Sequence, residues 1–414
     1  MTRLDIAIAG CGPAGLSCAL LLARAGHRVT LFDQLERPAP LGSGLMVQVT
    51  GLAVLGELGL DHAIRRRGAR IERMVGRAVP SGRTVLDVSY APLGAGYEGI
   101  AVHRATLFDV LYGAVLAAEL PIETAITVAA IEPAADGRPT LVAAGGKRFG
   151  PFDLVVDALG ARSPLTGAGA PELAFGALWA SLPWPGAPFA ERTLEQRYRR
   201  ASVMVGVLPI GLRPGDPTPQ CAFFWSMKPA GYGSWRERGL DAWKDEVRAI
   251  WPQTEPFLER LEGPDDLVLA RYRHRTLRRP AGLRLVHVGD SAHATSPQLG
   301  QGANMALLDA YALTTALGKE KDVAAALQSY VRARRWHVRL YQTLSAVFTP
   351  FYQSDSLLLP MLRDHLVATG ARLPLVPRLL AEIIAGTLGR PLERLGLDVG
   401  KVVRAGPLPE TLSP

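Results

Sequence analysis

One stretch, from Leu285 to Asn304, constrains this chain more than any other part of its sequence. It begins as a short apolar strand that ends at Gly289, and Asp290 follows at once. A turn-rich loop then leads through Gly-Gln-Gly into a long apolar helix that starts near Ala303. This order places a carboxylate at the carboxyl end of a strand, and free N–H groups at a helix start, which suit an anionic or electron-rich group. We therefore expect Asp290 to accept a hydrogen bond from a ribityl or ribose hydroxyl.

The amino-terminal residues form a second recognisable unit. The segment Leu4–Ala9 has a buried-strand pattern, and a glycine-rich loop, an apolar helix and a second strand that ends at Asp33 follow it. Glycines in such a loop let the backbone approach a pyrophosphate, and the acid can bind a ribose 2′-hydroxyl. Because Asp33 disfavours a 2′-phosphate, the tightly held dinucleotide should be FAD or NAD rather than NADP. The loop residues expected at the pyrophosphate are Gly10, Gly12, Pro13, Ala14 and Gly15.

Together these stretches resemble the class A flavoprotein monooxygenases, the para-hydroxybenzoate hydroxylase family. The second flavin signature of that family reads Gly-Asp, two small residues, His, then Pro, Gly-Gln-Gly and Asn. The resemblance implies that Asp290 contacts the ribityl chain of FAD and that the loop and helix start, including Ala303, lie against the pyrimidine edge of the flavin. Pro297 would pack near its reactive face. The matching positions are Gly289, Asp290, His293, Pro297, Gly300, Gln301, Gly302 and Asn304.

Two further segments match the family. Arg104 matches an arginine that reaches the FAD phosphate or ribose in the family, and a guanidinium fork suits phosphate oxygens. In the family a glycine-containing loop and strand, here residues 41–49, also pass the flavin ring. The resemblance therefore makes four residues of that segment candidates for flavin contact: Ser43, Gly44, Met46 and Gln48.

One family motif is altered. The family has Gly-Ala-Asp-Gly where this chain has Asp157-Ala158-Leu159-Gly160, and the replaced Asp is linked to FAD and nicotinamide binding in the family. We expect the side chains of Asp157 and Leu159 to share one face at the end of a strand. Either Asp157 has taken over the polar role, or backbone N–H groups hold the cofactor there. A two-residue shift moves a side chain by about 6–7 Å, which favours the second alternative.

The resemblance implies an α/β fold with a discontinuous Rossmann-like FAD-binding domain, residues 1–70, 101–170 and 276–345. A mostly antiparallel substrate-binding sheet would comprise residues 71–100 and 171–275, and residues 346–414 would form a C-terminal helical segment. Alternating strand patterns between residues 175 and 275 support such a sheet. The residues expected on its faces, some of them lining an apolar pocket above the flavin, are Val203, Val205, Phe223, Trp225 and Tyr272.

The implied function is that of an FAD-dependent monooxygenase. NADH or NADPH would reduce the flavin, O₂ would add to give a C4a-hydroperoxide, and its distal oxygen would pass to an aromatic or other electron-rich small molecule. Only one strand, glycine loop and helix unit is present, so the nicotinamide donor should bind transiently. Alternatives are a halogenase, epoxidase or reductase on the same fold, or a non-catalytic FAD-binding protein. The residues closest to the chemistry would be Met46, Pro297, Gly300 and Gly302.

Composition limits the other classes of function. Cys11, Cys18 and Cys221 lack metal spacing and argue for a reducing compartment. The net charge of +8 comes largely from scattered arginines, which we interpret as a source of solubility rather than a nucleic-acid footprint. No leader pattern precedes the first strand, and no apolar run reaches the roughly 18–20 residues that span a bilayer. We therefore expect a cytoplasmic monomer or homodimer without metal, nucleic acid or a transmembrane segment.

Overall fold

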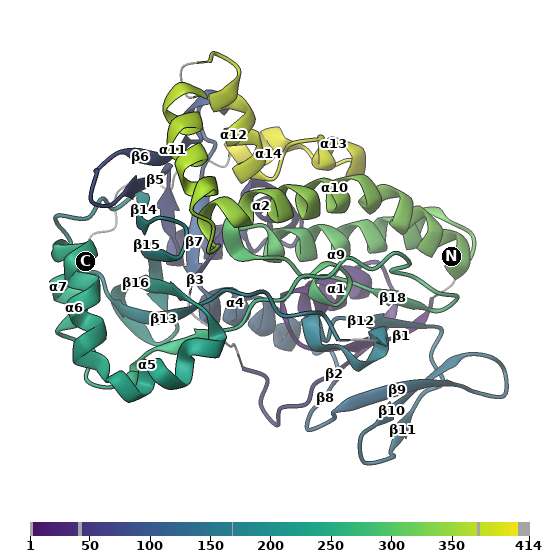
Figure 1. The fold of residues 1–414 in the computed structure, drawn as a ribbon. Helices are drawn as coiled ribbons and strands as arrows, with labels where there is room; N and C mark the ends of the chain where they lie inside the picture. The colour runs from purple at the N-terminus through teal and green to yellow at the C-terminus, as the bar shows by residue number, and fades with distance from the viewer. Residues whose placement is uncertain (1–2, 40–43, 168, 371–372, 405–414) are drawn as a thin grey trace.

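The computed structural model describes residues 3–39, 44–167, 169–370 and 373–404 and has an α/β architecture (Figure 1). One layer is a five-stranded parallel sheet in the order β18-β12-β1-β2-β8. Ile6 and Ile8 of its middle strand are fully buried, as expected for a parallel sheet that is covered on both faces. The strands are β1 (Asp5–Ala9), β2 (Arg28–Phe32), β8 (Ile122–Glu123), β12 (Leu154–Asp157) and β18 (Leu285–His287).

Helices from distant parts of the chain cover one face of this sheet. The glycine loop leads into α1 (Pro13–Arg24), which carries a proline at its first position, where no N–H is required. Helix α1 packs against both α4 (Arg104–Ala117) and α9 (Gly302–Lys319). The layer that covers β1 therefore combines the amino-terminal helix with the helix that follows β18.

A small antiparallel sheet covers the opposite face of the parallel sheet. Its strands are β9 (Val128–Pro133), β10 (Pro139–Ala143) and β11 (Arg148–Phe149). Phe32 and Val155 of the parallel sheet share a buried apolar cluster with Val128 and Leu141 of this small sheet.

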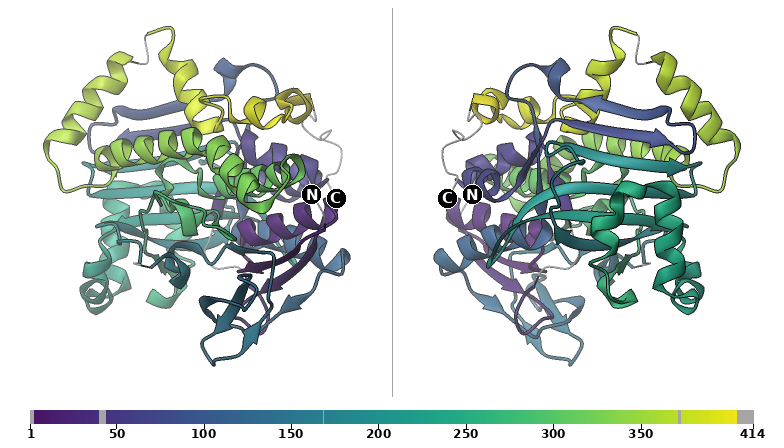
Figure 2. Two further views of the ribbon diagram at one scale, coloured as in Figure 1. Left: turned by 90° about the vertical axis from the view of Figure 1, so that its right-hand side faces the viewer. Right: turned by 90° about the vertical axis from the view of Figure 1, so that its left-hand side faces the viewer.

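A seven-stranded sheet forms the second large layer, in the order β17-β13-β16-β15-β14-β5-β6. Its neighbours are antiparallel except for the parallel pair β14 and β5. One face carries α5 (Tyr232–Arg238), α6 (Leu240–Ile250) and α7 (Glu255–Leu258) (Figure 2). The strands are β5 (Arg73–Ala78), β6 (Thr84–Ser89), β13 (Gly176–Pro183), β14 (Thr193–Arg199), β15 (Val203–Arg213), β16 (Asp216–Met227) and β17 (Val268–Ala270).

A three-stranded sheet lies against the other face of this large sheet. It consists of β3 (Gly44–Val47), β7 (Gly99–His103) and β4 (Ala69–Ile71), and strands β3 and β7 contact β15. The approach is close, because a Cβ at Gly44 would lie 2.7 Å from Cγ2 of Ile210 and 3.0 Å from Cβ of Ala222. Helices α2 (Val49–Glu57) and α3 (Asp61–Arg67) follow β3.

The C-terminal third is helical. Helix α10 (Val323–Tyr352) packs along α9, while α11 (Leu358–Gly370) and α12 (Val376–Ala385) pack on β6 at the top of Figure 1. Helices α13 (Pro391–Leu395) and α14 (Val399–Arg404) complete this part. Within the described ranges, no helix is both long enough and apolar enough to cross a membrane.

Two local expectations from the sequence differ from the structure. The sequence predicts one amphipathic helix from Leu52 to Ile64, but two helices occur, separated near Gly59, which has a φ of +70°. Strand β14 was not expected, because its sequence is rich in charged residues. It is nevertheless a strand, because Gln196 and Tyr198 bury alternate positions on one of its faces.

Candidate functional site

The glycine loop and the Gly289-Asp290 turn meet at the carboxyl edge of the parallel sheet. Gly289 has a φ of +59°, and a Cβ there would lie 3.1 Å from the Cβ atoms of both Ala14 on α1 and Ala306 on α9. Position 289 therefore requires glycine both for its backbone conformation and for the close approach of three segments. Ligands of open α/β sheets bind at this edge, outside the carboxyl ends of the strands.

The three glycines of the amino-terminal loop have different surroundings. A Cβ at Gly10, where φ is +106°, would lie 2.5 Å from the carbonyl oxygen of Ala158, and a Cβ at Gly15 would lie 1.9 Å from that of Gly10. These two glycines let the loop fold against the end of β12. At Gly12, which precedes α1 with an extended backbone, no atom lies within 4 Å of the Cβ position. Open space therefore adjoins the N–H groups of this helix start, as an anionic ligand requires.

The carboxylate of Asp33 organises the same loop. Its Oδ2 accepts a hydrogen bond from the N–H of Cys11 and its Oδ1 accepts one from the N–H of Leu35, each at 2.9 Å. Burial and the neighbouring Asp33 carboxylate raise the pKa of Cys11 to about 12. The thiol therefore stays protonated near neutral pH, which agrees with a packing role for Cys11.

Asp290 lies beside the start of α9. It opens the short helix α8 (Asp290–His293), and a Cβ at Gly302 would lie 3.9 Å from its Oδ1. Burial raises the pKa of Asp290, whereas the charges of His293 and Arg104 lower it. Asp290 is nevertheless classed as exposed, so a ligand can reach it from solvent. None of the described residues donates a hydrogen bond to it.

The side chain of Asn304 bonds to backbone groups of neighbouring segments. It is fully buried, and its Oδ1 accepts a hydrogen bond from the N–H of Gln48 at 2.8 Å. Its Nδ2 donates to the carbonyl oxygens of Met46 and Gly300, at 3.0 and 2.9 Å. The side chain that the resemblance placed at the flavin instead fastens the start of α9 to β3.

Gln301 was also expected at the flavin, but its side chain likewise bonds to the protein. Its side chain is buried and donates to the carbonyl oxygen of Ile384 on α12 at 2.7 Å. Gly302 and Ala303, in contrast, are partly exposed, and Pro297 is exposed. Gly300 has a left-handed backbone with a φ of +61°. Backbone groups, rather than the side chains of Gln301 and Asn304, are therefore available to a ligand at this helix start.

Arg104 is the first residue of α4, and its side chain is exposed. Its positive charge lowers the pKa values of Asp290 and Tyr272, so the guanidinium lies within electrostatic reach of both. Burial has the larger effect on Tyr272 and raises its pKa to about 12. The tyrosine hydroxyl, which accepts a hydrogen bond from Nε1 of Trp179 at 2.9 Å, therefore keeps its proton near neutral pH.

The altered motif forms a buried hydrogen-bond centre. The Oδ1 of Asp157 accepts from the N–H of Leu159 at 3.0 Å, and its Oδ2 accepts from the Ser163 hydroxyl at 2.6 Å and lies 2.7 Å from Nδ1 of His287. The expectation that Asp157 and Leu159 share one strand face is wrong, because β12 ends at Asp157 and a 3-10 turn begins after Leu159. The contacts of Asp157 are with protein groups, which favours the alternative in which it is not a cofactor ligand.

The predicted substrate residues lie on the helix-covered face of the seven-stranded sheet. Val205, Phe223 and Trp225 are buried in one cluster with the side chains of α5 to α7, and Val203 packs beside it. These four side chains therefore contact helices α5 to α7 and do not face β3. The opposite face, which contacts β3, carries Met204, Leu208, Ala222, Phe224 and Trp179.

Sequence reasoning did not single out Trp179, Met204 and Phe224, which lie on the face toward β3. The ring centroids of Trp179 and Phe224 lie 4.5 Å apart, so these two aromatic side chains pack together on that face. The sequence does show an alternation along β15 and β16, which separates two sets of side chains. Because both sets are apolar, the alternation does not tell which set faces β3.

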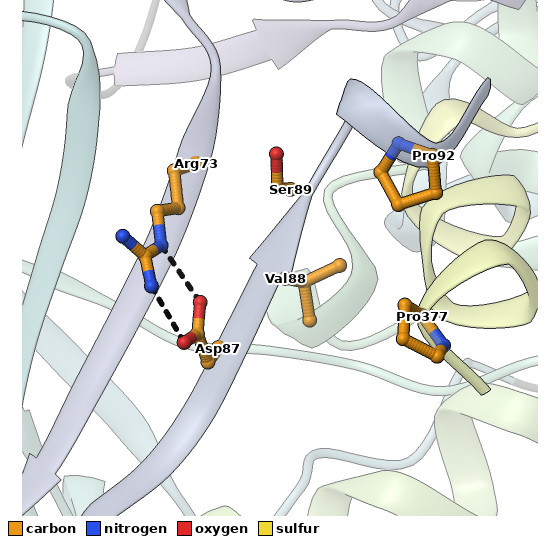
Figure 3. Close-up of a pocket in the computed structure, with 6 residues that line it drawn as sticks. All are labelled: Arg73, Asp87, Val88, Ser89, Pro92 and Pro377. Atoms are coloured by element: carbon orange, nitrogen blue, oxygen red, sulfur yellow. Dashed lines mark hydrogen bonds and ion pairs between the residues drawn. The ribbon is translucent and has the colours of Figure 1, made fainter. Parts of the chain in front are cut away.

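Two other parts of the molecule do not contribute to this site. A recess of about 280 Å³ between β5, β6 and α12 contains the paired side chains of Arg73 and Asp87 (Figure 3), but none of its lining residues belongs to the glycine loop or the Asp290 turn. In the described part of the chain, no group of three or more His, Cys, Asp or Glu side chains is arranged to hold a metal. Ser43, expected at the flavin, lies outside the described residues.

Comparison with known proteins identifies the family of this chain. The family model described as "FAD binding domain" matches residues 3–120 and 173–344. The 6-methylpretetramide 4-monooxygenase of Streptomyces rimosus is 30% identical over 355 residues, which cover 80% of this chain and 80% of that protein. The 3-hydroxybenzoate 6-hydroxylase 1 of Aquipseudomonas alcaligenes is 25% identical over 368 residues, or 84% of this chain and 89% of that protein.

Among solved structures, Klebsiella pneumoniae HpxO complexed with FAD and uric acid has a TM-score of 0.77 at 20% identity, over 93% of this chain and 98% of that chain. The fold and the site thus define a flavoprotein of the para-hydroxybenzoate hydroxylase type. This chain belongs to the FAD-binding-domain family and, within it, to the class A FAD-dependent aromatic hydroxylases. The residues present fit FAD, because Gly12 leaves room at a helix start and Asp290 offers an exposed carboxylate nearby.

Proposed function

We propose that this protein is a monooxygenase that uses FAD, NADH or NADPH, and O₂ to hydroxylate an aromatic or other electron-rich small molecule. One observation carries the proposal: the contact of Gly289 with Ala14 and Ala306. This contact brings the glycine loop, the exposed carboxylate of Asp290 and the start of α9 to one edge of the sheet. The names of the two curated relatives, both hydroxylating enzymes, support the reaction class.

We assign each part of FAD to a part of the chain. The pyrophosphate belongs at residues 10–15 and the N-terminus of α1, the adenosine ribose at Asp33 and the ribityl chain at Asp290. Arg104 supplies a positive charge for the phosphates or the ribose. The flavin ring belongs beside β3, which carries Gly44 and Met46, and beside the loop of residues 297–303.

When bound, FAD supplies hydride acceptance and O₂ activation, and the protein supplies position and exclusion of water. The N-terminus of α9 favours negative charge on a reduced ring, because its N–H groups and dipole point toward that position. Asn304 holds this helix start at a fixed distance from β3 through the carbonyl oxygens of Met46 and Gly300. The chain itself needs to supply no nucleophile.

We assign one wall of the substrate site to the inner face of the seven-stranded sheet, which is the face that contacts β3. Met204, Phe224 and Trp179 replace the residues proposed from sequence, because they lie on the face that contacts β3. The wall is apolar and aromatic, and its polar group is the Tyr272 hydroxyl, which is bonded to Trp179. Such a wall favours a flat, largely apolar ring, for which burial of apolar area is the main driving force.

The test is a substrate-stimulated assay of the purified protein. We expect it to contain FAD and to oxidise NADH or NADPH with O₂ uptake when the right compound from a panel of phenols, quinone precursors and polyketide-like aromatics is added. Mass spectrometry should then find a product that is heavier by one oxygen atom.

Two other outcomes would contradict the proposal. Oxidation of the nicotinamide without an oxygenated product would indicate a reductase. Bound FAD without any oxidation of NADH or NADPH across the panel would favour the non-catalytic alternative, for which the Leu159 substitution is the supporting observation.

A further inference from the structure

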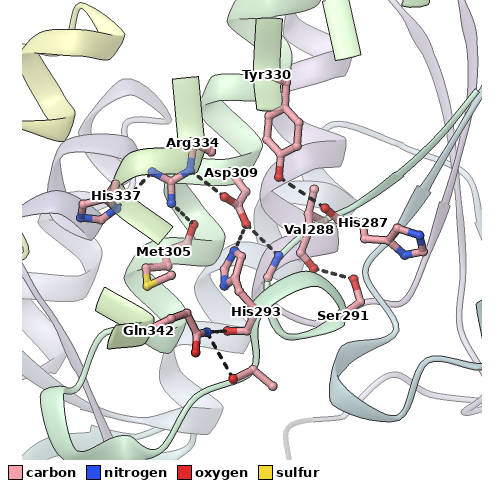
Figure 4. A network of polar contacts seen from close by, with 12 residues as sticks. His287, Val288, Ser291, His293, Met305, Asp309, Tyr330, Arg334, His337 and Gln342 are labelled. Carbon is pink, nitrogen blue, oxygen red and sulfur yellow. Dashed lines mark hydrogen bonds and ion pairs between the residues drawn. The ribbon is translucent and has the colours of Figure 1, made fainter. Parts of the chain in front are cut away.

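A buried series of polar groups connects the C-terminal helices with the turn that contains Asp290. Figure 4 shows its central part around Asp309 and Arg334. The centre of the series is Asp309 on α9, which is fully buried. The Oδ2 of Asp309 accepts from the N–H of Gly289 at 2.8 Å and lies 2.5 Å from Nε2 of His293. Its Oδ1 accepts from Nε of Arg334 on α10 at 2.7 Å. One carboxylate thus holds both ends of the segment that contains Asp290.

The series continues from Arg334 to α12 through His337. Nδ1 of His337 lies 3.2 Å from Nη1 of Arg334, and its Nε2 lies 3.2 Å from the carbonyl oxygen of Gly386, at the end of α12. Burial and the Arg334 charge lower the pKa of His337 to about 3, so the ring is neutral near neutral pH. Because a guanidinium can only donate, Nδ1 accepts from Arg334 and Nε2–H donates to Gly386.

Asp309 and Arg334 carry opposite charges and form a buried ion pair. Burial by itself would raise the pKa of Asp309, but His293 and Arg334 together hold it well below its ordinary value. Arg334 has a second contact, from Nη2 to the carbonyl oxygen of Met305 at 3.3 Å. A buried ion pair with this many hydrogen bonds fixes geometry, because loss of either partner leaves an uncompensated charge.

A second connection from α10 reaches the same turn. Nε2 of Gln342 donates to the carbonyl oxygens of His293 and Ala294, at 2.7 and 3.2 Å. Helix α10 therefore holds the turn in two ways, indirectly through the pairing of Arg334 with Asp309 and directly through Gln342.

We propose that Asp309, Arg334, His337 and the Gly386 carbonyl form a positioning relay, through which α12 sets the orientation of the Asp290 turn and hence the affinity for FAD. The inference rests on the proposed placement of the FAD ribityl chain at Asp290. It extends the determinants of FAD affinity to α12, which lies outside the residues matched by the family model. The relay residues act through the turn and need not touch the cofactor.

The test compares His337→Phe with Tyr341→Phe in the full chain. His337→Phe keeps a ring beside Tyr341 but removes both hydrogen bonds. Tyr341 provides a matched control at the same interface, because its hydroxyl donates to the carbonyl oxygen of Ile383 on α12 at 3.0 Å but has no described contact with Arg334 or Asp309. The Kd for FAD is measured by flavin-fluorescence titration of the apoprotein, and the Tm of each apoprotein is measured in parallel.

We expect His337→Phe to weaken FAD binding about tenfold, while Tyr341→Phe lowers the Tm and leaves the Kd within about twofold. His337→Gln, whose amide can both accept and donate, should recover most of the affinity. Arg334→Lys keeps a positive charge near Asp309 but lacks the fork that reaches His337, so it should weaken binding as His337→Phe does.

An unchanged Kd in folded His337→Phe or Arg334→Lys overturns the relay, as does equal weakening in Tyr341→Phe. If His337→Phe does not fold, Arg334→Lys decides alone. A wild-type protein that binds no FAD overturns the proposed function instead, so the two failures are distinguishable.

Discussion

We expect Asp290 to have opposing effects on FAD binding and on the stability of the apoprotein. Its exposed carboxylate suits a ribityl hydroxyl, but the protein around it raises its pKa, chiefly through burial. A charged group in such surroundings is retained where a ligand uses it. The same residue should therefore contribute to FAD affinity and diminish the stability of the apoprotein.

We predict that Asp290→Ala sharply lowers flavin occupancy. A charge-assisted hydrogen bond contributes roughly 1.5–3 kcal/mol, which corresponds to about a tenfold to more than a hundredfold loss of affinity. Flavin per chain, from the absorbance of the purified variant, and the Kd for FAD measure the effect. Full occupancy with unchanged activity would show that the ribityl assignment is wrong.

A second prediction concerns pH. The pKa of Asp290 lies above its ordinary value of 3.8 in the folded protein, so the folded state holds this proton more tightly than the unfolded state. Stability is therefore lost as the pH rises through the folded pKa. Asp290→Asn should raise the Tm of the apoprotein at pH 7 but not below the unfolded pKa. A variant that melts at or below the wild-type Tm at pH 7 contradicts this prediction.

A third prediction concerns Asp157, which is bonded to Leu159, Ser163 and His287. Asp157→Ala leaves these groups without their common partner and should cost about 3–5 kcal/mol of unfolding free energy. The Kd for FAD should change by less than tenfold, because the carboxylate contacts protein. Urea unfolding and FAD titration measure the two quantities. A loss of more than about tenfold in FAD affinity would identify Asp157 as the substitute for the family Asp.

At the scale of elements, the glycines at the junction of β1 and α1 have different roles: two are needed for folding and one is available for binding. Gly10 and Gly15 are required by the packing of the loop itself, since a Cβ at either position would overlap a backbone oxygen. Gly12 faces open space and has an extended backbone that any residue can adopt. Two glycines of one motif should therefore respond to substitution in opposite ways.

We predict that Gly12→Ala weakens FAD binding by about tenfold or more but changes the unfolding free energy of the apoprotein by no more than about 0.5 kcal/mol. Gly15→Ala should instead destabilise the fold by about 1–3 kcal/mol through overpacking. Thermal melts of the apoproteins and FAD titrations distinguish the two. Equal effects of both substitutions on stability would contradict the open space at Gly12.

At the scale of the whole molecule, the proposed site draws on two layered units. The parallel sheet and its helices supply the glycine loop and Asp290, while the seven-stranded sheet supplies the aromatic inner face. Helix α10 runs beside α9 and connects to the C-terminal helices. FAD affinity should consequently depend on parts of the chain that do not contact the cofactor.

The whole molecule also carries a prediction about stoichiometry. Only one unit of strand, glycine loop and helix occurs among the described residues, so one FAD per chain should bind tightly and the nicotinamide donor should leave no second nucleotide behind. Calorimetric titration of the apoprotein with FAD, and of the holoprotein with NADH and NADPH, measures this. Two well-ordered dinucleotide sites in a crystal would contradict the single-site arrangement.

The class of fold and the family could be predicted from the amino-acid sequence. The motifs that carry this prediction are local: a glycine loop between a strand and a helix, a proline at a helix start and a carboxylate at a strand end act within a few residues of one another. The motifs at residues 10–15 and 289–304 could be recognised for this reason, and the structure brings them together at Gly289.

The sequence could not predict which side chains lie on which face of the seven-stranded sheet. The seven-stranded sheet is covered on both faces, so both sets of alternating side chains are apolar, and Phe223 and Phe224 cannot be distinguished by pattern. The partners of Asn304, Asp157 and Asp309 likewise lie on segments that are remote in sequence. Such pairings depend on how the layers pack, because a buried polar group bonds to whichever donor or acceptor the fold brings within reach.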